Sequence, residues 1–131
     1  MQKGMCLILA GLMAAMILPI TPAAFAGRAQ QGDVIKEGSC SAASTWKLKA
    51  KPDNGQLEVQ FEVDENVVGD TWRVRLTDNG TLFFKGRRTT KAPSGSFEVT
   101  ARTANQAGTD RIVGKALNLS TGETCRGALS I

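Results

Sequence analysis

Apolar and polar residues alternate strictly along most of the chain after residue 40, and this alternation restricts the fold more than any other feature. In the segment 45–51, Trp46, Leu48 and Ala50 alternate with three lysines, and later segments repeat the pattern. A period of two is typical of half-buried β-strands, whereas an amphipathic helix repeats its apolar residues every three or four positions. No segment after residue 40 keeps such a helical repeat. The pattern predicts an all-β fold.

Turn residues separate these segments and delimit about seven strands. We expect the strands at 45–51, 57–64, 71–77, 81–87, 95–102, 111–118 and 123–131. This number and length of strands favours an immunoglobulin-like or fibronectin-like antiparallel sandwich, with a small β-barrel as the alternative. The strands occupy one domain, 40–131, and the polar, aperiodic stretch 27–39 is predicted to be a flexible N-terminal lead-in.

The turn at Asn54-Gly55 predicts how the first two strands pair. An Asn-Gly pair favours a type I′ hairpin, which places Asp53 opposite Gln56. In that register the apolar residues face one another, and Lys51 lies opposite Glu58 on the other face.

Two later turns give weaker predictions of register. A three-residue loop at 78–80 would place Leu76 opposite Leu82. A turn at Thr121-Gly122 would place Asn118 opposite Cys125, with small residues leaving room for a tryptophan of the facing sheet.

The segment 1–26 has the three parts of a cleavable secretory signal peptide. Lys3 precedes an apolar run, and the run ends at the small-residue triplet Ala24-Phe25-Ala26. We expect cleavage after Ala26 and a secreted or extracellular protein, free or associated with the cell wall, with no membrane anchor after cleavage. Export leaves two cysteines, Cys40 and Cys125, which predict one disulfide in an oxidising compartment.

The amino-acid composition excludes several kinds of catalytic and metal-binding site. The chain has no His and no Tyr, so His-based nucleophilic catalysis and His-ligated zinc are excluded. The two cysteines left after export lack a C-x-x-C spacing, which argues against redox catalysis. We therefore expect a protein that is not an enzyme and uses no metal or other cofactor. Only Lys3 of the 16 basic residues lies in 1–26, and the remaining mild positive excess does not indicate nucleic-acid binding.

Two groups of residues are candidates for recognition. The first is a basic face that could bind phosphate, acidic glycan or carboxylate, or could be merely solvated. Its residues are Arg73, Arg75, Lys85, Arg87 and Arg88. The second is an apolar partner surface of Val113, Leu117 and Leu119, which the expected register directs away from the core and which the lead-in could equally cover.

Several segments also resemble a family. The segments Cys40-Ser41, Thr45-Trp46-Lys47-Leu48, Trp72-Arg73-Val74-Arg75-Leu76, Ser94-Gly95-Ser96-Phe97-Glu98-Val99 and Thr121-Gly122-Glu123-Thr124-Cys125 resemble small, uncharacterised secreted β-sandwich proteins of high-GC Gram-positive bacteria (actinobacteria). The resemblance implies a bacterial source and supplies no site residues.

The leading functional hypothesis is an exported, non-catalytic binding module for an acidic cell-wall polymer or a secreted partner. The first alternative is an enzyme inhibitor or small hydrolase that uses loop residues, such as the loop 105–110. The second is a structural subunit that forms a homodimer through its apolar partner surface.

Overall fold

A computed structural model describes residues 32–131, so the predicted signal peptide and its cleavage site lie outside the described residues. The described part is all-β. Its eight strands are β1 (Val34–Ser39), β2 (Thr45–Asp53), β3 (Gln56–Asp64), β4 (Thr71–Asp78), β5 (Thr81–Thr89), β6 (Ser96–Ala104), β7 (Arg111–Asn118) and β8 (Thr124–Ser130). Within these residues no helix has the length and apolar character needed to cross a membrane.

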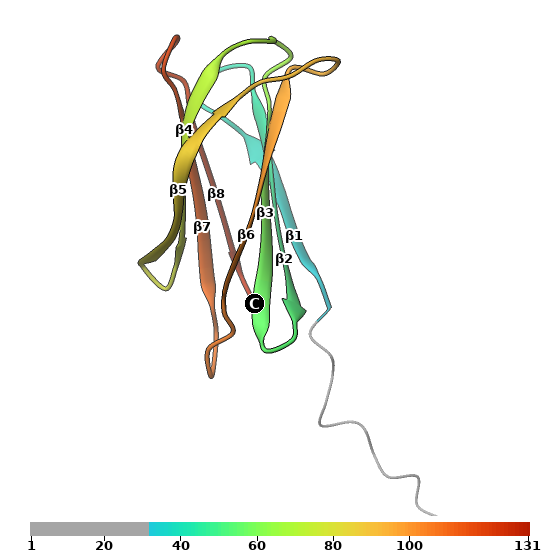
Figure 1. Ribbon diagram of the computed structural model, residues 1–131, viewed down its shortest axis with the longest axis vertical. Coiled ribbons are helices and arrows are strands. Elements are labelled where there is room, and N and C mark those ends of the chain that lie inside the picture. The colour runs from blue at the N-terminus through green and yellow to red at the C-terminus, as the bar shows by residue number, and fades with distance from the viewer. Residues whose placement is uncertain (1–31) are drawn as a thin grey trace, which may run out of the picture.

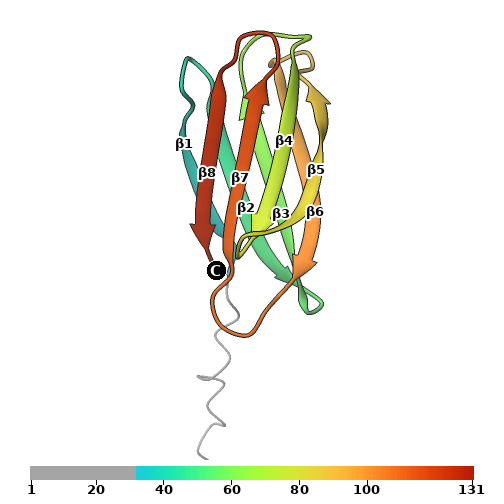
Figure 2. The same ribbon diagram turned by 90° about the vertical axis from the view of Figure 1, so that its left-hand side faces the viewer.

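The strands form two packed antiparallel sheets of four strands each (Figures 1 and 2). Sheet A has the order β1-β2-β3-β6, and sheet B has the order β5-β4-β7-β8. The sheets do not close into a barrel, so the predicted sandwich is confirmed and the barrel alternative is wrong. The inward-facing side chains make one core, which includes Trp72, Phe61, Leu48, Leu76 and Ile112.

The first hairpin pairs as its turn predicts. Asp53 lies opposite Gln56, and the register continues without a break to Thr45 opposite Asp64. Asn54 and Gly55 both have positive φ, at 51° and 76°, as a type I′ turn requires. The alternating pattern and the turn therefore specify the same pairing.

The prediction for the second hairpin is wrong. Its loop is the two-residue turn Asn79-Gly80, and the register shifts farther along, so that Leu76 lies opposite Phe84 instead of Leu82. The cause is a β-bulge in which Phe83 is the extra residue on β5. Because of the bulge, Phe83 and Phe84 both pack against the core although they are adjacent in sequence.

The register of the last hairpin is also wrong, by two residues. Ala116, not Asn118, lies opposite Cys125. The connection is longer than expected because the Asn118 side chain turns inward, and its Oδ1 accepts hydrogen bonds from the Ser120 and Thr121 N–H groups at 2.8 and 3.1 Å. A shift of two residues keeps each side chain on its expected face.

Part of the expected flexible lead-in is an ordered strand. Residues 34–39 form β1, which pairs with β2 along its whole length. This strand lies at the edge of sheet A and buries little, so its sequence shows no alternation. Residues 27–31 of the lead-in lie outside the described residues.

Glycines make room for large side chains between the sheets. A Cβ on Gly127 of β8 would lie 2.5 Å from the Trp46 ring, which confirms the expected space for a tryptophan. Gly38 of β1 gives the same ring room from its own sheet. Gly114 instead faces Phe61.

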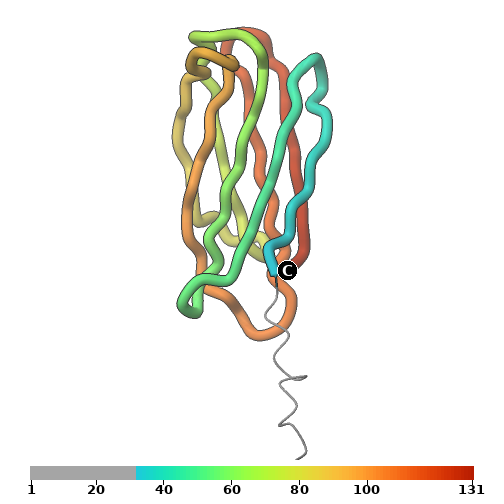
Figure 3. Tube along the Cα trace, turned by 90° about the vertical axis from the view of Figure 1, so that its right-hand side faces the viewer, coloured from blue at the N-terminus to red at the C-terminus, as the bar shows by residue number. Residues whose placement is uncertain are grey.

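The predicted disulfide joins Cys40 to Cys125. The bond links the end of β1 to β8, and these two strands lie side by side at one edge of the sandwich (Figure 3). Beside it, Ser41 N–H donates to the Thr124 carbonyl at 2.8 Å, and Thr124 N–H donates to Ser41 Oγ at 2.9 Å. The disulfide therefore closes the seam between the two sheets.

A buried carboxylate strengthens this corner. Glu123 accepts hydrogen bonds from Ala42 N–H, Ser44 N–H and Ser44 Oγ at 2.9, 3.0 and 2.6 Å. Burial raises the pKa of Glu123, but these hydrogen bonds outweigh it, so the pKa lies below its usual value.

Candidate functional site

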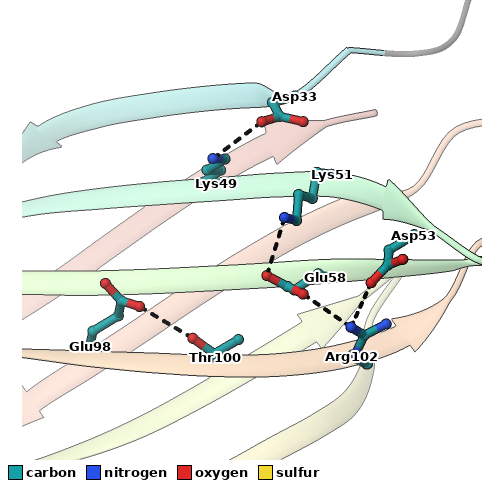
Figure 4. Close-up of polar contacts among 8 residues, drawn as sticks. All are labelled: Asp33, Lys49, Lys51, Asp53, Glu58, Glu98, Thr100 and Arg102. Atoms are coloured by element: carbon teal, nitrogen blue, oxygen red, sulfur yellow. Dashed lines mark hydrogen bonds and ion pairs between the residues drawn. The ribbon is translucent and has the colours of Figure 1, made fainter.

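The outer face of sheet A carries charges of both signs. Lys49 pairs with Asp33 at 3.2 Å, and Lys51 pairs with Glu58 at 3.7 Å. Arg102 of β6 contacts Glu58 as well as Asp53 (Figure 4). Within the described residues, this face neutralises its own cations.

The outer face of sheet B is different, because its cations have no acidic counterpart. Seven exposed basic side chains project outward from its four strands. Arg111 lies at the start of β7, and the other six lie together: Arg73, Arg75, Lys85, Arg87, Lys115 and Arg126. The only carboxylate within these strands is Asp78, which points inward and is 1% exposed. Among the described residues, none of the six takes part in an ion pair. We call these six residues the basic face.

The pairing of the strands arranges the basic face in rows that cross the sheet. Arg75 lies opposite Lys85 on one side and opposite Lys115 on the other. Lys115 in turn lies opposite Arg126, so each strand of sheet B contributes one cation to this row. Adjacent strands are about 4.8 Å apart, and the row of four therefore spans about 14 Å.

A second row adjoins the first on one side only. Arg73 lies opposite Arg87 in β5 and opposite Leu117 in β7. Leu117 lies opposite Thr124. The half of the face on β4 and β5 is consequently richer in charge than the half on β7 and β8.

The structure separates one predicted residue from the others. Arg88 lies opposite the buried Trp72, and it therefore projects from the other side of β5 than Arg87. Its guanidinium stacks over the Phe84 ring at 5.2 Å from the ring centroid and donates to the Arg87 carbonyl at 2.8 Å. The expectation that Arg88 belongs to the basic face is wrong because neighbouring residues of a strand project to opposite sides of the sheet.

Two shallow hollows flank the two arginines of β4. One, of about 430 Å³, is lined by Arg73, Arg75, Lys85, Gly86 and Arg87. The other, of about 370 Å³, lies over β7 and has a more apolar surface from Leu117 and Ala116 between the cations. A larger hollow of about 510 Å³ lies beside Trp46 on sheet A, but its lysine and carboxylates are of mixed sign. The basic face is the more distinctive site, since its charge is uncompensated.

The predicted apolar partner surface points outward, but it is not separate from the basic face. Val113 and Leu117 are half-buried, and Leu119 is 40% exposed. Leu117 lies beside Arg73, and Val113 is two residues from Lys115. The two sequence-based candidates therefore share one surface of sheet B.

Two polar clusters lie at the ends of the sandwich. Asp78 and Asp110 are both buried, and burial raises the pKa of Asp78, which the neighbouring Asp110 carboxylate raises further. At the other end, Asn118 Nδ2 donates to Glu65 at 2.7 Å and to Asp70 at 3.1 Å. Burial also raises the pKa of Glu65, whereas the hydrogen bond from Asn118 lowers that of Asp70. These clusters hold loops in place, and no group of three or more metal-ligating side chains gathers within residues 32–131.

Sequence reasoning missed two members of the basic face, Lys115 and Arg126. Both alternate with inward residues of their strands, so their outward direction was visible in the sequence. Their position beside Arg75 depends on the pairing of β4 with β7, which joins segments distant in sequence. No local signal gives that pairing.

The fold and the face together define a disulfide-closed β-sandwich with one charge-balanced sheet and one basic sheet. Comparison of the chain with protein-family models, curated proteins and solved structures found no match.

Proposed function

We propose that this protein is an exported, non-catalytic binding module whose basic face binds an acidic cell-wall polymer. The observation that carries the proposal is the absence of any exposed carboxylate from the four strands of sheet B, which hold the six exposed cations of the basic face. Arginine guanidinium groups bind phosphate and carboxylate through paired hydrogen bonds, and four of the six cations are arginines.

The arrangement of the cations supports a ligand more than a structural role. Like charges directly opposite each other on neighbouring strands destabilise a sheet. Arg75 has such a neighbour on both sides. A polyanion that lies across the face would relieve this repulsion, whereas nothing within the described residues does so.

An extracellular place of action rests on two features. The Cys40–Cys125 disulfide is compatible with an oxidising, extracellular location. The predicted signal peptide in 1–26 would deliver the chain there, and the resemblance to secreted actinobacterial proteins suggests a bacterial cell wall as the setting.

The homodimer alternative, in which the predicted apolar surface is the interface, has less support. If two copies stacked these sheet faces together, their Arg73 and Arg75 side chains would meet cations of like sign around Leu117. The loop-based alternative has no comparable charge signal. Gln106 N–H donates to Asp110 at 3.2 Å and anchors that loop to the domain.

The test compares two double variants with equal loss of charge. Arg73→Gln/Arg75→Gln removes cations from the basic face, and Lys47→Gln/Lys49→Gln removes cations from the outer face of sheet A. We expect the exported protein to sediment with purified Gram-positive cell walls at low salt. Only the arginine variant should lose this retention, and equal retention of both variants would refute the proposal.

A further inference from the structure

The cations of sheet B do not form a round patch. Lys85, Arg75, Lys115 and Arg126 lie in one line, with one residue on each of the four strands. On one side of this line the neighbouring row is uncharged, since it consists of Thr77, Val113 and Ala128. The charge is therefore concentrated along a line that runs across the strands.

The line has dimensions that fit an extended polymer. The cations are separated by one strand spacing, about 4.8 Å, and the whole line spans about 14 Å. The two hollows lie over opposite parts of the line, one on the β5 side and one on the β8 side. A compact anion would occupy one hollow, whereas a chain would contact all four cations.

We propose that the ligand is a single extended chain of phosphate groups that crosses the four strands from Lys85 to Arg126. This inference rests on the proposed function and specifies the class and direction of the polymer. Phosphate suits the line because Arg75 and Arg126 can each offer two parallel N–H donors to its oxygens. The lysines between and beside them act as point charges.

The two ends of the line have different surroundings. Beside Lys85, the second row adds Arg87 and Arg73, which increases the positive charge at that end. Beside Arg126, the corresponding positions are Thr124 and Leu117. The end of the chain over β5 therefore lies in a more positive surrounding than the end over β8.

Arg111 provides a matched control on the outer side of sheet B, outside the basic face. It is exposed and lies on β7, four residues from Lys115. At about 3.3 Å per residue it is about 13 Å from the line along the strand. Its Nη1 donates only a long hydrogen bond, 3.4 Å, to Ser130 Oγ, so Arg111→Gln should leave the fold intact. Loss of this charge lowers the net charge as much as Arg126→Gln does.

The experiment titrates the exported protein and three variants with long-chain inorganic polyphosphate at several salt concentrations. Four phosphate contacts predict that the logarithm of the binding constant falls against the logarithm of salt concentration with a slope of about −2.8. Arg126→Gln and Lys85→Gln should each make the slope shallower by about 0.7. Each should weaken binding about two- to fivefold, and Arg111→Gln should change neither quantity.

The possible outcomes separate this inference from the proposed function. One outcome is that the unaltered protein binds polyphosphate while Arg111→Gln weakens binding as much as Arg126→Gln. In that case binding depends on the total positive charge of sheet B, and the proposed line of contacts across the four strands is wrong. The same conclusion follows if Arg126→Gln has no effect. If the unaltered protein does not bind polyphosphate at low salt but is retained by cell walls through Arg73 and Arg75, this inference is wrong and the proposed function stands. If the protein binds neither polyphosphate nor cell walls, both are overturned.

Discussion

Removal of the Cys40–Cys125 disulfide should strongly destabilise the domain. The bond joins residues 85 positions apart and so closes a loop that includes most of the domain. The chain-entropy treatment gives a stabilisation of about 4.5 kcal/mol for a loop of this length. Small domains have total stabilities of about 5–15 kcal/mol, so the variant without the bond should be only marginally stable at best.

The assay is urea unfolding of the exported protein and of Cys40→Ala/Cys125→Ala, followed by tryptophan fluorescence. With a dependence of about 1–3 kcal/mol per molar urea, the midpoint should fall by about 1.5–4.5 M. Each single Cys→Ala variant should lose nearly as much as the double variant, because either substitution opens the same loop. A loss below about 1 kcal/mol would contradict the stabilisation expected from closing this loop.

Three further substitutions test separate parts of the structure. Gly127→Ala should lower the free energy of unfolding by about 1–3 kcal/mol in urea titration, because the new methyl group would clash with Trp46; an unchanged midpoint would contradict that packing. The pKa of Asp78 is raised in the folded protein, so the protonated carboxyl group stabilises the fold. This stabilisation is complete below the usual pKa of about 3.8, and it is lost as the pH rises through the raised pKa. Asp78→Asn, which can donate to Asp110 at any pH, should therefore be less sensitive to pH above about 4 than the unaltered protein, and an identical dependence on pH would argue against the raised pKa. Arg75→Gln should stabilise the fold by about a few tenths of a kcal/mol at low salt, because it removes like charges opposed on both neighbouring strands, and this gain should disappear at high salt; thermal melts at two salt concentrations would show it, and a loss of stability at low salt would contradict it.

The sequence contained enough local information for the fold class and for one hairpin. Between Asp53 and Gln56 the turn type, the apolar pattern and the opposed charges all specify one register, and that register is present. At the second hairpin the apolar residues Leu82, Phe83 and Phe84 are consecutive, so the pattern cannot show which of them is the bulged residue.

The candidate site was predictable only in part. Arg73 and Arg75 share a face because they are two residues apart on one strand, and this is a local property. Their proximity to Lys115 and Arg126 depends on pairings between distant segments. The absence of carboxylates from the whole face likewise becomes visible only when the strands of each sheet are known. Strand β1 was missed because an edge strand that buries little needs no alternation.

A map of where a polyanion contacts the protein would show directly whether the basic face is the binding surface. Amide chemical shifts of the exported protein would be followed by NMR during titration with long-chain polyphosphate. We expect the largest changes on β5, β4, β7 and β8, around Arg75 and Lys115, and little change on the outer face of sheet A. Changes centred on sheet A, or on the hollow beside Trp46, would contradict this expectation.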